Sequence, residues 1–290
     1  MRLAQKLDSF ILNATRSNAP ASYTTQIHHP RLPSDTLTFD FDSPPLAVDD
    51  VYIALLDSFY SAAQQLSDQS GNPKGIVKDE HFRINSAYYH LDIGSDLYAD
   101  PGTFTLQHLK TVLSTLITLQ QRYNLRECTF IWRTPKGQLL QGELRNPAHP
   151  APPREVVADP HTDVLFGGSV RYTHYGEPIP FEAVAVAMLS IMREVWARMT
   201  QAGKAARELH VSNDIYAQET PFLRFEVRAA VAYTFRLDYL LNVPYAVAMY
   251  GRSFPMRAFV FVMDSAEGRK FHGRVVKRDG LSGGNWTAVS

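Results

Sequence analysis

The stretch LTFDFDSPPLAVDDVYIALLDSFYSAAQQL (residues 37–66) aligns without a gap with VRYTHYGEPIPFEAVAVAMLSIMREVWARM (residues 170–199), at a shift of 133 residues. Pro45 falls on Pro178 and Leu56 falls on Leu189. Each stretch begins with alternating apolar residues, passes through a proline-containing turn and continues with apolar residues at helical spacing. The pattern therefore predicts a strand followed by a long helix, twice in the chain.

A second match relates LDIGSDLYAD (91–100) to LHVSNDIYAQ (209–218), at a shift of 118 residues. The drop in shift from 133 to 118 assigns 15 extra residues to the first copy, in the loop-like segment before residue 81. The match predicts a second strand in each copy, at 88–98 and 207–216. Agreement in pattern over both matches indicates an internal repeat.

Each copy is then expected to have the order β-α-β-α-β-β, with the second helix beginning near Thr103 or Thr220. A β-hairpin closes each copy, at 128–145 and at 245–263. We predict an α+β fold made by tandem duplication, in which two helices of each copy cover one face of a mixed four-stranded sheet. The expected organisation is an N-terminal arm with a short amphipathic helix (1–36), a first repeat (37–146), a Pro-rich linker (147–164), a second repeat (165–264) and a basic C-terminal tail (265–290).

Charge and cysteine usage exclude several classes of function. Lys+Arg and Asp+Glu both number 29, so no net charge attracts polyanions. Nucleic acid is an unlikely partner except through the basic tail, and the single cysteine, Cys128, excludes an internal disulfide framework. Phosphate-loop, dinucleotide and zinc-protease motifs are absent, so we expect no cofactor and no metal. The basic positions of the tail that we expect to bind an anionic partner are Lys270, Arg274, Lys277 and Arg278.

No segment of the sequence is typical of a membrane span. The longest uncharged apolar run covers residues 183–192, and a spanning helix needs about 20 residues. The N-terminus lacks the apolar core of a secretory signal. We therefore expect an intracellular, cytoplasmic location without a membrane partner. Mitochondrial import is the alternative, because Leu3, Leu7 and Phe10 fall on one face of a basic N-terminal helix.

The second strand of each copy carries the strongest candidates for chemistry. Side chains alternate along a strand, which places His90 and Asp92 on one face in the first copy, and Glu208 and His210 on one face in the second. If the two sheets face each other, these four groups line a shared cleft. A histidine beside a carboxylate titrates near neutrality and can transfer protons there. The simpler interpretation is a solvent-facing side of the sheet, where polar residues alternate with apolar ones.

An aspartate followed two residues later by a tyrosine recurs in both matched segments. A position shared by two copies indicates a common structural or binding role, because an aspartate at a strand end can accept hydrogen bonds from the next turn. The residues concerned are Asp96 and Tyr98 in the first copy, and Asp214 and Tyr216 in the second.

Two classes of function remain open. The missing catalytic signatures, and the two quasi-equivalent surfaces of a duplicated unit, favour a non-enzymatic binding or interaction protein that self-associates into a homo-oligomer. The alternative is a small-molecule enzyme of the isomerase or hydrolase type, with acid/base chemistry in a polar His/acid cleft between the repeats. A small-molecule ligand fits either class. The deciding observation is whether the two polar faces converge on one cavity.

Overall fold

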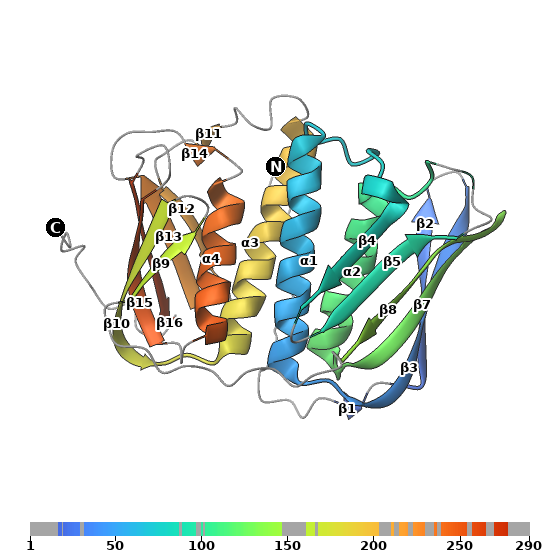
Figure 1. Ribbon diagram of the computed structural model, residues 1–290, viewed down its shortest axis with the longest axis horizontal. Coiled ribbons are helices and arrows are strands. Elements are labelled where there is room, and N and C mark those ends of the chain that lie inside the picture. Colours follow the sequence, from blue (N-terminus) through green and yellow to red (C-terminus); the bar gives the residue numbers. More distant parts are fainter. Residues whose placement is uncertain are drawn as a thin grey trace.

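The computed structural model describes residues 17–18, 20–29, 32–86, 89–96, 100, 102–146, 161–165, 168–202, 210–211, 215–219, 223–229, 235–236, 239–253, 257–264 and 270–277. Within them, two six-stranded sheets lie on opposite sides of four long helices (Figure 1). The α+β class expected from the sequence is therefore confirmed. The short N-terminal helix expected before residue 17 lies outside the described residues.

The first half of the chain alternates pairs of strands with helices. Its sheet has the strand order β2-β3-β7-β8-β5-β4, and every neighbouring pair is antiparallel. A separate short parallel ladder joins β1 to β6. The elements are β1 (Ser17–Asn18), β2 (Ser22–His29), β3 (Leu32–Pro45), α1 (Val48–Asp68), the 3₁₀ helix η1 (Lys78–Glu80), β4 (His81–Asn85), β5 (His90–Ser95), α2 (Leu106–Arg122), β6 (Tyr123–Asn124), β7 (Arg126–Thr134) and β8 (Gly137–Arg145).

The second half repeats the same connectivity. Its sheet has the order β9-β10-β15-β16-β13-β12, again antiparallel throughout, while β11 pairs with β14 beside it. The elements are β9 (His161–Leu165), β10 (Gly168–Pro178), α3 (Phe181–Ala202), β11 (His210–Val211), β12 (Ile215–Glu219), β13 (Leu223–Ala229), β14 (Phe235–Arg236), α4 (Tyr239–Ser253), β15 (Arg257–Asp264) and β16 (Lys270–Lys277).

The expected mixed four-stranded sheet is wrong in both strand number and direction. The strand that directly follows α1 is β4, at the edge of the sheet, and the hairpin after it reverses the chain so that β5 runs antiparallel to β8. The unit also begins with a hairpin, because β2 pairs with β3. The order β-α-β-α-β-β therefore lacks one strand before each helix.

Corresponding elements of the two halves begin one constant interval apart. The starts of α1 and α3, β5 and β13, α2 and α4, and β8 and β16 are each separated by 133 residues. The second shift of 118 residues is therefore wrong, and so is a second helix at Thr220. The segment expected as a strand at 245–250 belongs instead to α4, and the closing hairpin of the second half is β15–β16.

Three expected boundaries also change. The N-terminal arm contains β2 and the start of β3, both in the first sheet. The Pro-rich linker ends earlier than expected, because β9 pairs with β10 in the second sheet. The basic C-terminal tail contains β16, an interior strand between β13 and β15. Each of these segments is recruited because its backbone N–H and C=O groups need partners once the sheet is buried on one face.

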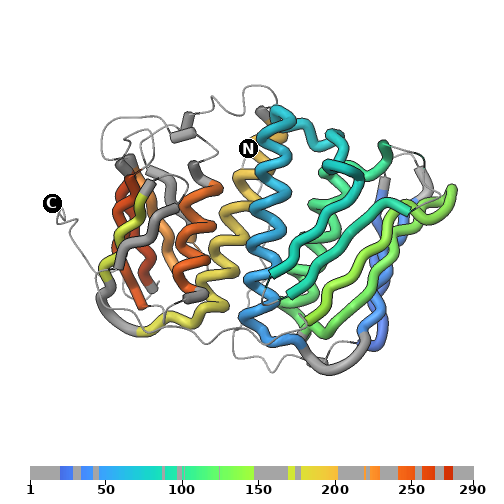
Figure 2. Tube along the Cα trace, in the orientation of Figure 1, coloured from blue at the N-terminus to red at the C-terminus, as the bar shows by residue number. Residues whose placement is uncertain are grey.

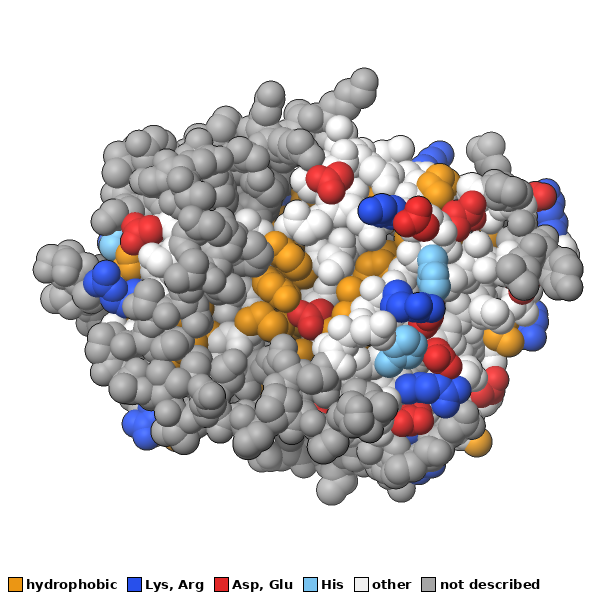
Figure 3. Space-filling view, in the orientation of Figure 1, with side chains coloured by type: hydrophobic (Ala, Val, Ile, Leu, Met, Phe, Trp, Pro, Cys, Tyr) orange, Lys and Arg blue, Asp and Glu red, His pale blue; other side chains and the backbone are white. Residues whose placement is uncertain are grey.

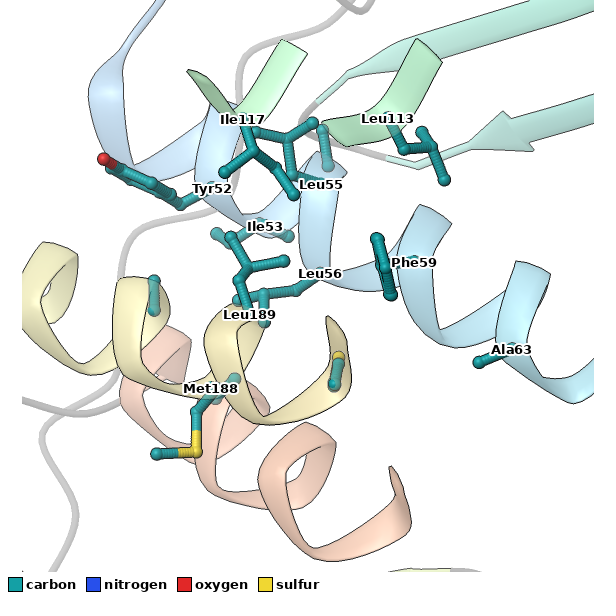
Figure 4. Packing of buried hydrophobic residues seen from close by; sticks show 14 of the residues in the cluster. Tyr52, Ile53, Leu55, Leu56, Phe59, Ala63, Leu113, Ile117, Met188 and Leu189 are labelled. Carbon is teal, nitrogen blue, oxygen red and sulfur yellow. The ribbon is translucent and has the colours of Figure 1, made fainter. Parts of the chain in front are cut away.

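The helices form the middle of the molecule, and α1 lies at its centre. It packs against α2, α3 and α4, and the tube view confirms the side-by-side placement of α1 and α3 (Figure 2). Figure 4 shows Leu55 on the side of Ile117 in α2, and Leu56 beside Leu189 in α3. A helix with buried apolar residues toward more than one neighbour lies inside a core, and α1 has such residues toward both α2 and α3. One continuous core therefore serves both halves.

Polar contacts also join the halves. The carboxylate of Asp57 accepts hydrogen bonds from the Tyr89 hydroxyl at 2.6 Å and from the Tyr245 hydroxyl at 2.7 Å. The ring of Tyr60 stacks on Tyr245 with centroids 4.1 Å apart, and its hydroxyl donates to Asn242 Oδ1 at 2.9 Å. Directional contacts of this kind fix one orientation of α1 against α4, which apolar packing alone specifies less tightly.

Candidate functional site

The structure places three of the four candidates for a shared cleft, and it separates those of the first copy from that of the second. His90 and Asp92 lie on β5 in the first sheet, whereas His210 lies on β11 beside the second half, with helices between them (Figure 1). Glu208 lies outside the described residues. The apolar faces of both sheets are covered by the helices, so the polar faces point away from each other. The expected cleft between the repeats is therefore wrong.

Asp92 is the centre of a charged cluster on the outer face of the first sheet. Its register partner on β4 is Arg83, whose Nε and Nη2 lie 2.8 Å and 2.6 Å from Asp92 Oδ2. Nε2 of His81 contacts Asp92 Oδ1. Nε2 of His90 lies 3.8 Å from Asp92 Oδ2. One carboxylate thus faces three basic side chains from two strands.

Glu143 on β8 extends the cluster across the sheet. It is the register partner of Asp92 on β5. Its Oε1 lies 3.5 Å from Nε2 of His90, and its Oε2 accepts a hydrogen bond from Nε of Arg145 at 2.6 Å. His90 is therefore placed between two carboxylates, and its Nδ1 contacts Asn85 Oδ1. Figure 3 shows these basic, acidic and histidine side chains gathered on the right of the molecule.

The pKa of Asp92 follows from these neighbours. Partial burial alone would raise it, but hydrogen bonds and charge from His81 and Arg83 outweigh burial and lower the pKa below its ordinary value. The unfolded carboxyl titrates near pH ~4. The stabilisation is therefore fully present above that pH and disappears as the pH falls through the lower pKa of the folded protein.

Replacing Asp92 by asparagine is expected to lower the free energy of unfolding by about 1 kcal/mol at pH 7, since its partners are partly solvent-exposed. The difference between the two proteins is expected to shrink below pH ~4, because the unfolded carboxyl becomes neutral there and the folded one follows at lower pH. Urea unfolding at pH 7 and pH 3 measures both values. An unchanged difference at the two pH values would contradict the ionised role of Asp92.

A groove lies beside the cluster on the same face. It has a volume of about 700 Å³ and runs over β5, β7 and β8, with η1 and the start of β4 at its edge. Among the described residues that line it, the charged side chains are four carboxylates and one histidine, and none is a lysine or arginine: Asp79, Glu80, Asp92, Glu143 and His81. Among the residues that the structure describes, no group of three or more His, Cys, Asp or Glu side chains is placed to hold a metal ion.

The edge of the groove has an unusual backbone. Asp79 and Glu80, in η1, have φ angles of 57° and 49°, in the left-handed region that non-glycine residues seldom occupy. Oε1 of Glu80 accepts a hydrogen bond from the backbone N–H of Gly102 at 2.6 Å, which holds this turn in place. Such strain concentrates at functional sites. The same turn places His81 beside Asp92.

The register of the two sheets identifies the counterpart of this site in the second half. In each sheet, an aromatic residue on the helix-facing side is followed across the strands by a phenylalanine, a glycine and an aliphatic residue. The two rows are Phe39, Phe130, Gly142 and Ile93, and Tyr172, Phe261, Gly273 and Val227. Ile93 and Val227 occupy the same position in the two rows. The residues that precede them, Asp92 and Glu226, therefore correspond as well.

The counterpart is closed where the first site is open. Glu226 is only 3% exposed, it contacts Nη2 of Arg224, and its Oε2 accepts a hydrogen bond from Nε of Arg274 at 2.5 Å. Two residues after Asp92 the first half has Gly94, and two residues after Glu226 the second half has Arg228. Arg274, expected in a free basic tail, is therefore a partner of a buried carboxylate.

The other candidates fall into two groups. Asp96 follows β5, and its backbone N–H donates to the carbonyl of Leu139 at 3.0 Å. Tyr216 lies on β12, and Lys270 and Lys277 lie on β16. Because β5 corresponds to β13, the Asp and Tyr of the two copies are not equivalent positions. Four candidates lie outside the described residues: Tyr98, Glu208, Asp214 and Arg278.

Reasoning from the sequence missed His81, Arg83, Glu143 and Glu226. The last could have been found, since HLDI (90–93) aligns with RFEV (224–227) as a polar, apolar, acidic and apolar run. Cys128 is buried on β7.

Comparisons with known proteins add no family to this description. No family model matches the chain, and no curated protein matches it. Among solved structures, the chain is similar to the tandem DUF26 ectodomain of the Arabidopsis thaliana cysteine-rich receptor-like protein PDLP8. The identity is 9%, over 82% of this chain and 96% of that chain, with a TM-score of 0.22. None of the helices within the described residues has the length and apolar run that a membrane crossing needs.

Proposed function

We propose that this protein binds a polar ligand in the groove on the outer face of its first sheet. The observation that carries the proposal is the difference between Gly94 and Arg228. The same fold position is left empty beside Asp92 in one half, and carries a long side chain beside Glu226 in the other. An open, strained and charged site in one half, with a closed counterpart in the other half, is expected when one site binds and the other only stabilises.

The lining favours a ligand with positive charge or several hydrogen-bond donors. Four carboxylates among the described residues line the groove. Arg83 pairs with Asp92 and Arg145 pairs with Glu143, whereas Asp79 and Glu80 form no ion pair within the described residues. Carboxylates accept hydrogen bonds and do not donate them when ionised. We therefore propose an amine or a short basic peptide segment as the ligand class. An open groove of about 700 Å³ is large enough for either.

The experiment uses Gly94→Arg, which reproduces the side chain of Arg228 in the first half. A Cβ at Gly94 would lie 3.6 Å from Cδ2 of His81, an ordinary contact, so the variant is expected to fold. Its arginine fills the groove and neutralises the carboxylates. Calorimetric titration with spermidine is expected to show saturable binding to the wild type, weakened at least tenfold in Gly94→Arg.

The matched control is Arg228→Gly, which opens the second half and leaves the groove of the first half intact. Its spermidine affinity is expected to stay within twofold of the wild type. Equal affinity of Gly94→Arg and wild type would contradict the proposed site. Weaker binding in Gly94→Arg together with equally stronger binding in Arg228→Gly would point to net charge rather than to the groove, because the two variants change the charge in opposite directions.

Acid/base catalysis is the second candidate, and one contact favours it. The bond from His81 Nε2 to Asp92 fixes the imidazole at the groove wall, as a carboxylate orients a histidine base in many enzymes. His81→Gln keeps a side chain that can hydrogen-bond to Asp92 but cannot transfer protons near neutrality. Ligand binding with no chemical change of the bound ligand in the wild type would exclude this candidate.

Self-association and an origin by duplication are part of the same proposal. The repeated connectivity supports duplication. Within the described residues, the edge strands β2, β4, β9 and β12 each have a neighbour on one side only. Unpaired edges are the surfaces through which sheets extend between chains.

A further inference from the structure

A second pocket lies on the boundary between the two halves, away from the groove. It has a volume of about 290 Å³ and is lined by β2, α2 and α3. The α2 contribution is a polar stripe at helical spacing, which turns its hydroxyls and one ammonium away from the core. The stripe consists of Gln107, Lys110, Thr111, Ser114, Thr115 and Thr118. Arg193 of α3 faces this stripe.

The charges that the described residues bring to this pocket have one sign. The charged residues among them are Lys110 and Arg193, and none of them is a carboxylate. Neither cation forms an ion pair with an acid among the residues that the structure describes. The ammonium of Lys110 lies 5.9 Å from the ring centroid of Trp196, over a buried surface. Two cations held together without a counter-charge are unfavourable in an empty pocket.

The pKa of Lys110 reflects this arrangement. Burial lowers it first, and the positive charge of Arg193 lowers it further. A bound anion would reverse the second effect. The two cations therefore lower the stability of the folded protein when the pocket is empty and raise it when an anion is bound. This is expected for a binding site and not for a structural contact.

The hydroxyls divide into two sets. Those of Thr111, Thr115 and Thr118 each donate to a carbonyl one turn earlier in α2, at 2.9 Å, so they have no proton left for a ligand. The hydroxyls of Tyr23, Thr25 and Ser114 make no hydrogen bond with the described residues. Free hydroxyl donors therefore come from β2 and α2, and the guanidinium of Arg193 adds donors from α3.

We propose that this pocket binds a phosphate group, either as the free ion or as part of a small phosphomonoester. Two cations match a group that carries about −1.5 to −2 charges at neutral pH. The guanidinium of Arg193 suits bidentate contact with phosphate oxygens, and Lys110 acts as a point charge. Donors arranged on three sides fit a tetrahedral oxyanion better than a planar carboxylate. The volume is at the lower end for small-molecule sites, which fits a small ester.

The site also links the two halves, because Lys110 belongs to α2 and Arg193 to α3. A bound phosphate would draw these helices together and stabilise the folded chain in proportion to its affinity. This gives a readout that needs no knowledge of the biological ligand.

The test measures binding of inorganic phosphate and of glycerol 3-phosphate to the full chain, with ionic strength held constant by sodium chloride. Calorimetry gives the dissociation constants, and thermal unfolding gives the shift in midpoint. We expect saturable binding of at least one probe, with a raised midpoint that chloride does not reproduce. A tighter inorganic ion identifies the free anion as the ligand, and a tighter ester identifies a phosphomonoester.

Lys110→Gln and Arg193→Gln are each expected to weaken binding at least tenfold. Both remove one positive charge, and their unfolding without ligand shows that they are folded. The matched control is Arg122→Gln, which makes the same change at the exposed end of α2, outside the pocket. It is expected to bind within twofold of the wild type. The proposal is overturned if neither probe binds saturably, if the two pocket variants keep their affinity, or if Arg122→Gln loses as much.

Discussion

A protein made of residues 1–146 alone is expected to lose the cooperative unfolding of the full chain and to self-associate. The side of α1 that meets α3 would become exposed, including Leu56 and Phe59, which are fully buried in the whole molecule. Exposing each such side chain to water lowers the stability of the fold by roughly 1.5–3 kcal/mol. Size-exclusion chromatography with light scattering measures the association, and urea unfolding followed by circular dichroism measures the cooperativity.

Co-expression with residues 147–290 provides the control. The second half covers the exposed face of α1 with α3 and α4, so a soluble one-to-one complex is expected. A monomeric first half that unfolds in one sharp transition by itself would contradict the shared core. It would also mean that each repeat is an independent domain, as a simple reading of the repeated sequence suggests.

Replacing Phe59 by alanine is expected to lower the free energy of unfolding by about 4 kcal/mol, in the range found for large aromatic residues in cores. Its ring meets Trp196 edge-on with centroids 5.6 Å apart, so one substitution leaves a cavity between α1 and α3. Urea unfolding at constant pH measures the loss, and an unchanged m-value confirms that the same surface is exposed.

Ile76→Ala is the comparison for that measurement. Ile76 is 39% exposed, whereas Phe59 is fully buried. Its removal is expected to change stability by less than ~0.5 kcal/mol. A loss below about 1 kcal/mol in Phe59→Ala would show that the helices can close the cavity by relaxing, and that the boundary between the halves is less tightly packed than the contacts indicate.

Long periodic segments were predictable from the sequence. The helices expected at 46–66 and 179–200 are α1 and α3, at 48–68 and 181–202. The first hairpin, β7–β8, was also predicted, because its turn residues Thr134–Gly137 select one geometry. By contrast, α4 was predicted as a strand. It contains Pro244 and short apolar runs that fit either structure, and its burial against α3 decides between them.

The candidate site was predictable only in part. His90 and Asp92 do lie together on the outer face, but the partners of Asp92 come from β4, for which the sequence predicted no strand. Which residues pair across two strands depends on the register of the sheet, and the sequence of a single strand does not specify that register. The alignment of the two copies at a shift of 118 residues was wrong for a related reason. Alternation has a period of two, so two strands match at many offsets, and only the spacing of the helices identifies the right one.

The glycine that faces a phenylalanine ring in each sheet also has a consequence for how the chain folds. A Cβ at Gly142 would collide with the ring of Phe130, and one at Gly273 would collide with the ring of Phe261. A slip of one residue would bring a bulky side chain under the ring and turn the apolar row toward water. Each glycine therefore makes misaligned pairing of its two strands unfavourable even before the helices pack on the sheet. The strand register of each half is then selected by contacts within that half.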